Sequence, residues 1–297
     1  MAKNPKSAPN RKTVKKAESH KVHKALPGVW TLTKKTAAIL WINRTLFLGI
    51  AVVYALLTLV FVGVASNANI TNLKQSFDGN SSLVTGIGLF INLIGTSGSN
   101  SNAAAGAYQF MIAIIASLAI IWAYRQVVAG VKIRVRDSYY KGMYGLVPFV
   151  IILIIIGLQL LPLLIGSAVY GQVMNNGIAV AVFEKLLWGM LFGISALISL
   201  YMLSSTIFAL YISALPDMTP VKALRSAHDL VKGRRIVLIR KILYLPLLLL
   251  VLSAIIMLPF IIWMTALAQV VFFMLGIMVL LVVHGYFYVL YRELINE

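Results

Sequence analysis

Six long apolar stretches dominate the pattern of hydrophobic and polar positions along this chain of 297 residues. A helix needs about 20 mainly apolar residues to cross the hydrocarbon core of a bilayer. Each stretch approaches or exceeds that length, and shorter polar or basic segments separate most of them. The predicted spans are Leu46–Ala65, Tyr108–Tyr124, Leu146–Ser167, Leu186–Ile212, Ile242–Trp263 and Leu267–Leu290. The pattern predicts an all-α fold, a polytopic bundle of six transmembrane helices.

Composition supports a lipid environment for these stretches. Hydrophobic residues make up 60% of the chain and charged residues 11%, whereas soluble domains average about 45–50% and 25%. A soluble core of this size could not hide that excess of apolar surface. A competing interpretation takes Leu46–Ala65 as the apolar part of a signal peptide. The long polar arm before it and the length of the run disfavour that interpretation.

The placement of charge predicts the orientation in the membrane. The net charge is +18, and all but Lys74 and Lys185 of the 26 Lys and Arg residues fall on one side of the predicted spans. They occupy the N-terminal segment, the connections after the second and fourth spans, and the C-terminus. Basic segments are retained in the cytoplasm. Both termini are therefore predicted to be cytoplasmic, in a multi-pass protein of the plasma membrane.

This topology divides the chain into three segments. Residues 1–28 form a basic cytoplasmic arm with too few apolar residues to fold, and we expect it to be disordered. It either serves topology and solubility or adheres to anionic lipid headgroups; nucleic acid is not expected, because no aromatic residues interleave with its charges. Residues 29–294 form the six-span membrane domain, with an outer loop over 66–107, and residues 295–297 form a cytoplasmic tail. In that loop Ser81–Gly95 is either an interfacial helix or a loop packed on the bundle.

The third cytoplasmic segment predicts a basic helix on the membrane surface. Thr219 is a good N-cap, Pro220 suits the first helical position, and Gly233 suits the C-terminal stop. One face carries Leu224, Ala227 and Val231, and the opposite face carries Lys222, Arg225, Asp229 and Lys232. Such an amphipathic pattern is typical of an interfacial helix.

Similar short helices are predicted before the first and third spans. Val131–Arg136 alternates like an extended chain, and Asp137 is then expected to cap a short helix through Tyr140. Trp30–Asn43 occupies the same place before the first span, with weaker amphipathicity. We interpret the chain as three hairpin repeats, each preceded by a basic interfacial helix.

Few polar residues lie inside the spans, and these are candidates for an intramembrane site. Gln159, Gln269 and His284 would face the central cavity of a transporter or channel. Alternatively, His284 is a neutral histidine hydrogen-bonded across helices, because no buried acid is available to pair with it. Gly189 and Gly193 form a GxxxG pattern, which we expect to pack within the bundle rather than to dimerise. Helices are expected to kink or end at Pro148, Pro162, Pro246 and Pro259.

The sequence contains no motif for catalysis, for a cofactor or for a metal. The chain has no cysteine, and its histidines, His20, His23, His228 and His284, are scattered. It has no phosphate loop, no nucleophile elbow and no HExxH pattern. We therefore expect neither enzyme activity nor a cofactor.

Three short segments resemble a group of bacterial integral membrane proteins. They are Val135–Gly142, Pro220–Arg235 and Phe287–Leu294, the second with a proline, an Ala-Leu pair, a serine and a Lys-Gly ending. They look similar to the membrane domain attached to some glycerophosphodiester phosphodiesterases and to YciC-type inner-membrane proteins. The resemblance implies six spans, a bacterial inner membrane and no enzyme activity. The catalysis of the phosphodiesterases belongs to a separate soluble domain that has no counterpart in this chain. The basic arm and the Asn/Ser-rich outer loop depart from the pattern.

Together these features favour a non-catalytic integral membrane protein that binds or organises membrane lipids or protein partners. The expected ligands are anionic headgroups on the cytoplasmic side. The residues expected to contact them are Lys222, Arg225, Lys232, Arg234 and Arg235. A small-solute transporter or channel built around Gln159, Gln269 and His284 is the alternative.

Overall fold

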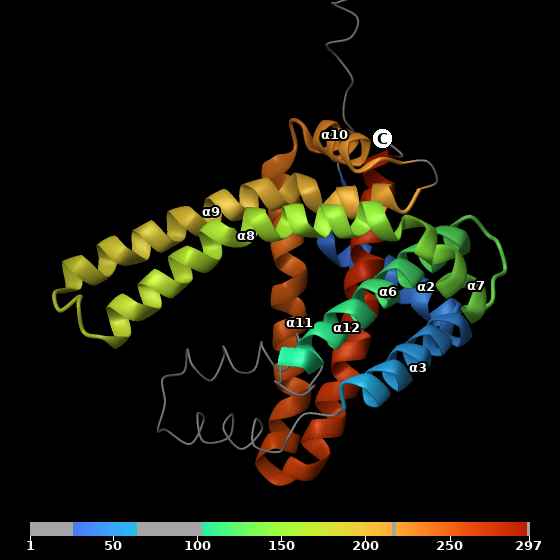
Figure 1. The fold of residues 1–297 in the computed structure, drawn as a ribbon, viewed down its shortest axis with the longest axis horizontal. Coiled ribbons are helices and arrows are strands. Elements are labelled where there is room, and N and C mark those ends of the chain that lie inside the picture. The colour runs from blue at the N-terminus through green and yellow to red at the C-terminus, as the bar shows by residue number, and fades with distance from the viewer. Residues whose placement is uncertain (1–25, 64–102, 216–217, 296–297) are drawn as a thin grey trace, which may run out of the picture.

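Helices account for all the regular structure in the described part of the chain (Figure 1). The computed structural model describes residues 26–63, 103–215 and 218–295. The elements are α2 (Val29–Ile42), α3 (Arg44–Phe61), α6 (Ala103–Val128), α7 (Val135–Gly142), the 3-10 helix η2 (Met143–Gly145), α8 (Leu146–Asn175), α9 (Val182–Ser213), α10 (Pro220–Val231), α11 (Arg235–Trp263) and α12 (Thr265–Ile295). The predicted loop helix Ser81–Gly95 and residues 1–25 of the basic arm lie outside the described residues.

The helices α3, α6, α8, α9, α11 and α12 are long and apolar enough to cross a membrane. The prediction of six spans is confirmed, and the chain is a multi-pass membrane protein. The third and fourth spans are longer than predicted, because α8 continues to Asn175 and α9 already begins at Val182. Gly177 separates them with a φ of +65°, a backbone conformation that favours glycine. Only Met264 separates α11 from α12.

The order of elements agrees with three hairpin repeats. Each unit begins with a short helix and continues with two long ones: α2 with α3 and α6, α7 with α8 and α9, and α10 with α11 and α12. The two long helices of each unit pack on each other. This order places the short helices at the same end of their hairpins.

Local signals in the sequence determine the ends of the short helices. The Thr219 hydroxyl accepts the Lys222 N–H at 3.4 Å, Pro220 is the first residue of α10, and Gly233 follows with a φ of +84°. The prediction that Asp137 is the N-cap of α7 is wrong. That helix begins at Val135, and the Asp137 carboxylate, one turn in, accepts the backbone N–H of the cap residue at 3.4 Å.

None of the long helices ends at a proline. Pro162 lies inside α8, and both Pro246 and Pro259 lie inside α11. Beside Pro162, the Leu163 N–H donates to the Ser199 hydroxyl of α9 at 3.1 Å. Serine side chains can satisfy backbone groups freed by proline inside a membrane, which explains why α8 continues past this position.

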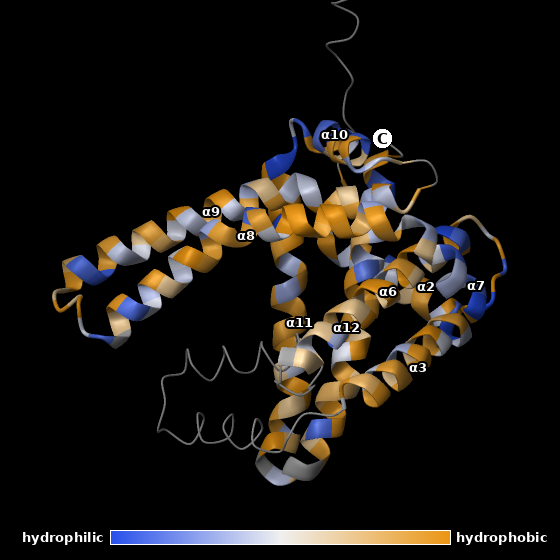
Figure 2. Ribbon diagram, viewed as in Figure 1, coloured by the Kyte–Doolittle hydropathy of each residue, from blue (hydrophilic) through white to orange (hydrophobic). Residues whose placement is uncertain are grey.

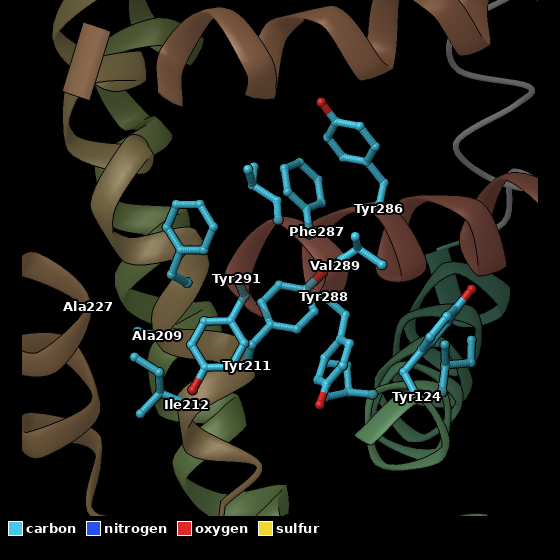
Figure 3. Packing of buried hydrophobic residues seen from close by; sticks show 14 of the residues in the cluster. Tyr124, Ala209, Tyr211, Ile212, Ala227, Tyr286, Phe287, Tyr288, Val289 and Tyr291 are labelled. Carbon is cyan, nitrogen blue, oxygen red and sulfur yellow. The ribbon is translucent and has the colours of Figure 1, made fainter. Parts of the chain in front are cut away.

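The largest packed core lies where α10, the C-terminal half of α12 and the C-terminal ends of α6 and α9 meet (Figure 3). Tyr124, Phe208 and Tyr286 are fully buried there. α10 contributes one apolar face, with Ala223, Ala227 and Val231 all 0% exposed. We call this end of the molecule, which includes α7, α10 and the C-terminal turns of α12, the basic end.

The α8–α9 hairpin, called the arm below and distinct from the N-terminal basic arm, runs away from α11 and α12 rather than alongside them (Figure 1). The other described helices, α2, α3, α6, α7, α10, α11 and α12, are called the body. Only 11% and 6% of the most apolar stretches of its two helices are buried, against 50% in α6. The expectation that Gly189 and Gly193 pack within the bundle is wrong, because a Cβ at either position would meet no atom within 4 Å. The close approach of α8 and α9 occurs instead at Gly166, where a Cβ would lie 3.0 Å from that of Ser195.

Candidate functional site

Positive charge is concentrated at the basic end. Lys185 is the one exception among the described Lys and Arg residues. The others lie in or next to the short helices α2, α7 and α10, or at the ends of the long helices that adjoin them: the start of α3, the end of α6, the first turns of α11 and the end of α12. Figure 2 shows this polarity as hydrophilic residues around α7 and α10. The described acids at this end are Asp137, Asp229 and Glu293. Glu293 is paired with Lys35.

The five residues predicted to contact lipid or a partner lie together on and beside α10. Lys222, Arg225 and Lys232 are exposed, while Arg234 and Arg235 are half-buried at the start of α11. The Arg235 guanidinium lies over the ring of Tyr201 at 4.5 Å. We call the group Lys222, Arg225, Lys232, Arg234 and Arg235 the α10 surface.

Two large apolar side chains border the α10 surface. Val221 is 67% exposed and Ile236 is 85% exposed. Exposed apolar residues beside cations are typical of a helix at the boundary between headgroups and acyl chains. The opposite face of α10 is already occupied by the core, so the helix presents a cationic and partly apolar outer face.

A second basic feature is a pocket of about 740 Å³ that opens beside α7. We call it the basic pocket. It is lined by Trp122, Arg125, Gln126, Val131, Lys132, Ile133, Asp137, Lys141, Tyr144, Gly145, Pro148, Ser213, Ala214, Leu215 and Met218. Small-molecule sites occupy about 300–1,000 Å³, so a headgroup-sized ligand fits.

The cations of this pocket have no carboxylate partner within 4.0 Å among the residues that the structure describes. Arg125 donates through Nη1 to the carbonyl of Ala214 at 3.4 Å. Lys141 lies over the ring of Trp122 at 5.9 Å. Asp137, the one carboxylate among the described lining residues, accepts the backbone N–H of Arg134, the cap residue of α7. The pocket is thus electropositive.

The walls of the basic pocket are held by close backbone contacts. A Cβ at Gly142 would lie 3.1 Å from the carbonyl oxygen of Leu118 in α6, and one at Gly145 would lie 3.3 Å from that of Ser213 in α9. Glycine at both positions lets α7 pack on α6 and lets the start of α8 pack on the end of α9. The pocket therefore lies at the root of the arm, between the arm and the body.

The intramembrane polar residues do not come together. Gln269 and His284 are both in α12, and at 1.5 Å per residue they are separated by about 22 Å along the helix axis. Gln159 belongs to α8, in the arm. His284 is bonded across helices, with Nε2 2.8 Å from the Ser117 hydroxyl and Nδ1 3.3 Å from the Tyr211 hydroxyl.

A further buried polar group lies between α3 and α6. Gln109 donates to the Tyr54 hydroxyl at 2.7 Å, and Thr58 is fully buried nearby on α3. No three His, Asp or Glu side chains gather as a metal site in the part of the chain that the structure describes.

The basic pocket could not be predicted from the sequence. Arg125, Lys132 and Lys141 were visible only as members of a basic connection, used there to assign topology. Their convergence depends on how α6, α7 and α9 pack, which residue spacing does not reveal. The available signal was the pair of glycines, Gly142 and Gly145, that brackets the junction of α7 and α8.

Comparisons with protein-family models, with curated proteins and with solved structures found no match to this chain. The function is therefore argued from the geometry of the basic end.

Proposed function

We propose that this chain is a non-catalytic integral membrane protein whose basic end faces the cytoplasm and binds anionic lipid headgroups. The observation that supports the proposal is the α10 surface. Its helix is anchored by a buried apolar face, and its exposed Lys222, Arg225 and Lys232 point away from the core.

The electrostatics favour a membrane surface as the ligand. Each Lys or Arg held near an anionic leaflet contributes about 1 kcal/mol. α10 leads directly into the membrane helix α11, with only Lys232–Arg234 between them, so its cations lie at headgroup depth. The exposed Val221 and Ile236 add apolar contacts with the outer part of the acyl chains.

We also propose a bacterial plasma membrane as the location. The support is the resemblance of Pro220–Arg235 to the inner-membrane families named above, together with the charge asymmetry between the two sides of the spans.

The proposal is tested by the lipids that surround the protein. The full chain is extracted from membranes of mixed lipid in polymer-bounded discs, and the ratio of anionic to zwitterionic lipid in the discs is measured. We expect enrichment of anionic lipid around the unmodified chain. The triple variant K222Q/R225Q/K232Q should reduce that enrichment at least twofold.

Lys185 supplies a charge-matched control. It is exposed near the tip of the arm, far from α10 in the chain. The single variant K222Q should lower the enrichment, and K185Q should leave it unchanged. Equal effects of these two single variants, or no effect of the triple variant, would overturn the proposal.

A further inference from the structure

We propose that the basic pocket binds the headgroup of one lipid that carries at least two negative charges on phosphate, and that this lipid joins the arm to the body. This goes beyond the proposed function, which needs only the outer face of α10 and a bulk anionic surface. The pocket is instead a discrete site that holds one molecule.

The charge of the pocket sets the charge of its ligand. Among the described lining residues, Arg125, Lys132 and Lys141 contribute three positive charges and Asp137 contributes one negative charge, which leaves an excess of two positive charges. A ligand with two negative charges neutralises the remaining excess, whereas a headgroup with one charge leaves it unbalanced. Arginine and lysine are the usual partners of phosphate, and arginine can bind it with two parallel hydrogen bonds.

The apolar part of the lining favours a lipid over free phosphate. Ile133, Pro148, Leu215 and Met218 share the pocket with the cations. An inorganic ion would leave these side chains without a partner, but the glycerol and first methylene groups of a lipid would cover them. Trp122 and Tyr144 also line the pocket. Such aromatic residues are enriched at the level of the headgroups.

The position of the pocket gives the lipid a structural role. Arg125 and Trp122 belong to α6 in the body, while Pro148 and Ala214 belong to the two ends of the arm at its root. Besides the contact of α8 with α9, the arm packs on α10 and α11 but only sparsely on α6. A headgroup bound here contacts body and arm at once, and so holds the arm in its observed direction.

The test uses native mass spectrometry of the full chain in detergent. Phosphatidic acid, cardiolipin, phosphatidylglycerol and phosphatidylcholine are added separately at equal concentration. We expect one molecule of phosphatidic acid or cardiolipin per chain, bound at least tenfold more tightly than phosphatidylglycerol. The variant R125Q/K132Q/K141Q should weaken that binding at least tenfold.

Two further variants keep the test independent of folding and of total charge. K132Q/K141Q leaves the bond from Arg125 to α9 intact and should still weaken binding severalfold. R134Q/R136Q/R240Q removes three exposed charges of the basic end that do not line the pocket. It should leave binding unchanged within twofold.

Three results would overturn the inference. They are equal binding of phosphatidylglycerol, equal losses in the pocket and control triple variants, and displacement of the lipid by glycerol phosphate at comparable concentration. The last result would assign the pocket to a soluble phosphate compound. Loss of anionic enrichment in discs of K222Q/R225Q/K232Q without loss of the tightly bound lipid would separate this site from the α10 surface.

Discussion

Helices α6 and α9 are both long, apolar and able to cross a bilayer, yet they bury very different parts of their surfaces. Half of the most apolar stretch of α6 is buried within the protein, against 6% of that of α9. α6 buries Ala116, Ala119 and Ala123 against its neighbours, and small residues let membrane helices approach closely. α9 turns large side chains such as Leu197 and Ile194 outward, where lipid covers them.

The comparison shows that hydropathy predicts a span but not its neighbours. Lipid is as apolar as a leucine side chain, so no hydrophobic force drives one span onto another. Close packing, small residues and hydrogen bonds instead determine which spans pack on each other. The body has such a bond between His284 and Ser117, and a second bond joins His284 to Tyr211 at the end of α9. The arm relies mainly on the contact of α8 with α9.

The largest contrast is expected from adding one methyl group to a glycine of each region. In G285A the new Cβ would overlap the Tyr124 hydroxyl and lie 2.8 Å from Cγ2 of Thr36. Neither side chain has room to move, because both are buried, so the cost should be near the upper end of the usual range for overpacking, about 3 kcal/mol. The matched change G193A meets open space and should be neutral or stabilise by up to about 1 kcal/mol.

Thermal unfolding in detergent, followed by circular dichroism, measures both glycine variants. The contrast between body and arm fails if G193A destabilises the protein as much as G285A does. That outcome would mean that a neighbour covers the Gly193 face of the arm.

A smaller contrast is expected from truncating large apolar side chains. Phe208 is 0% exposed and Leu197 is 66% exposed. A buried Phe→Ala change costs about 3–5 kcal/mol in soluble proteins. In soluble proteins, part of this loss of stability comes from the transfer of the side chain out of water, and that part is absent in a membrane. F208A should therefore lower the stability by about 2 kcal/mol, because of the cavity that it leaves. L197A should cost less than about 0.5 kcal/mol, because lipid refills the space.

Midpoints of unfolding in a mixed-micelle titration with denaturing detergent would quantify this pair. Both residues belong to α9, so equal shifts for F208A and L197A would show that the outer part of the arm is packed as closely as its end in the core.

The smallest effect concerns hydrogen bonds. H284L removes two cross-helix bonds and leaves the hydroxyls of Ser117 and Tyr211 without that partner. Hydrogen bonds between membrane helices average about 0.6 kcal/mol, so the loss should be about 1 kcal/mol. S199A removes one bond, to the Leu163 N–H of the arm, and should cost about half as much. A larger loss for S199A than for H284L, in the same unfolding assay, would reverse the order of the two regions.

Local features of this fold could be predicted from sequence, and those that depend on packing could not. Thr219 and Gly233 act within one turn of α10, so their roles are visible in a short segment. The number of spans follows from length and apolarity alone. In contrast, Gly193 sits in a pattern that usually marks a helix contact, yet in the structure no helix reaches it. Likewise, Arg125 and Lys141 are 16 positions apart in the numbering, on separate helices. Only the packing of α7 on α6 brings them to one pocket.

Lipid binding at the basic pocket is tested most directly by an experimental structure of the full chain in lipid that contains phosphatidic acid or cardiolipin. We predict one ordered lipid at the root of the arm, with phosphate between Arg125, Lys132 and Lys141. An unoccupied basic pocket in such a structure, with ordered anionic lipid bound elsewhere on the protein, would contradict it.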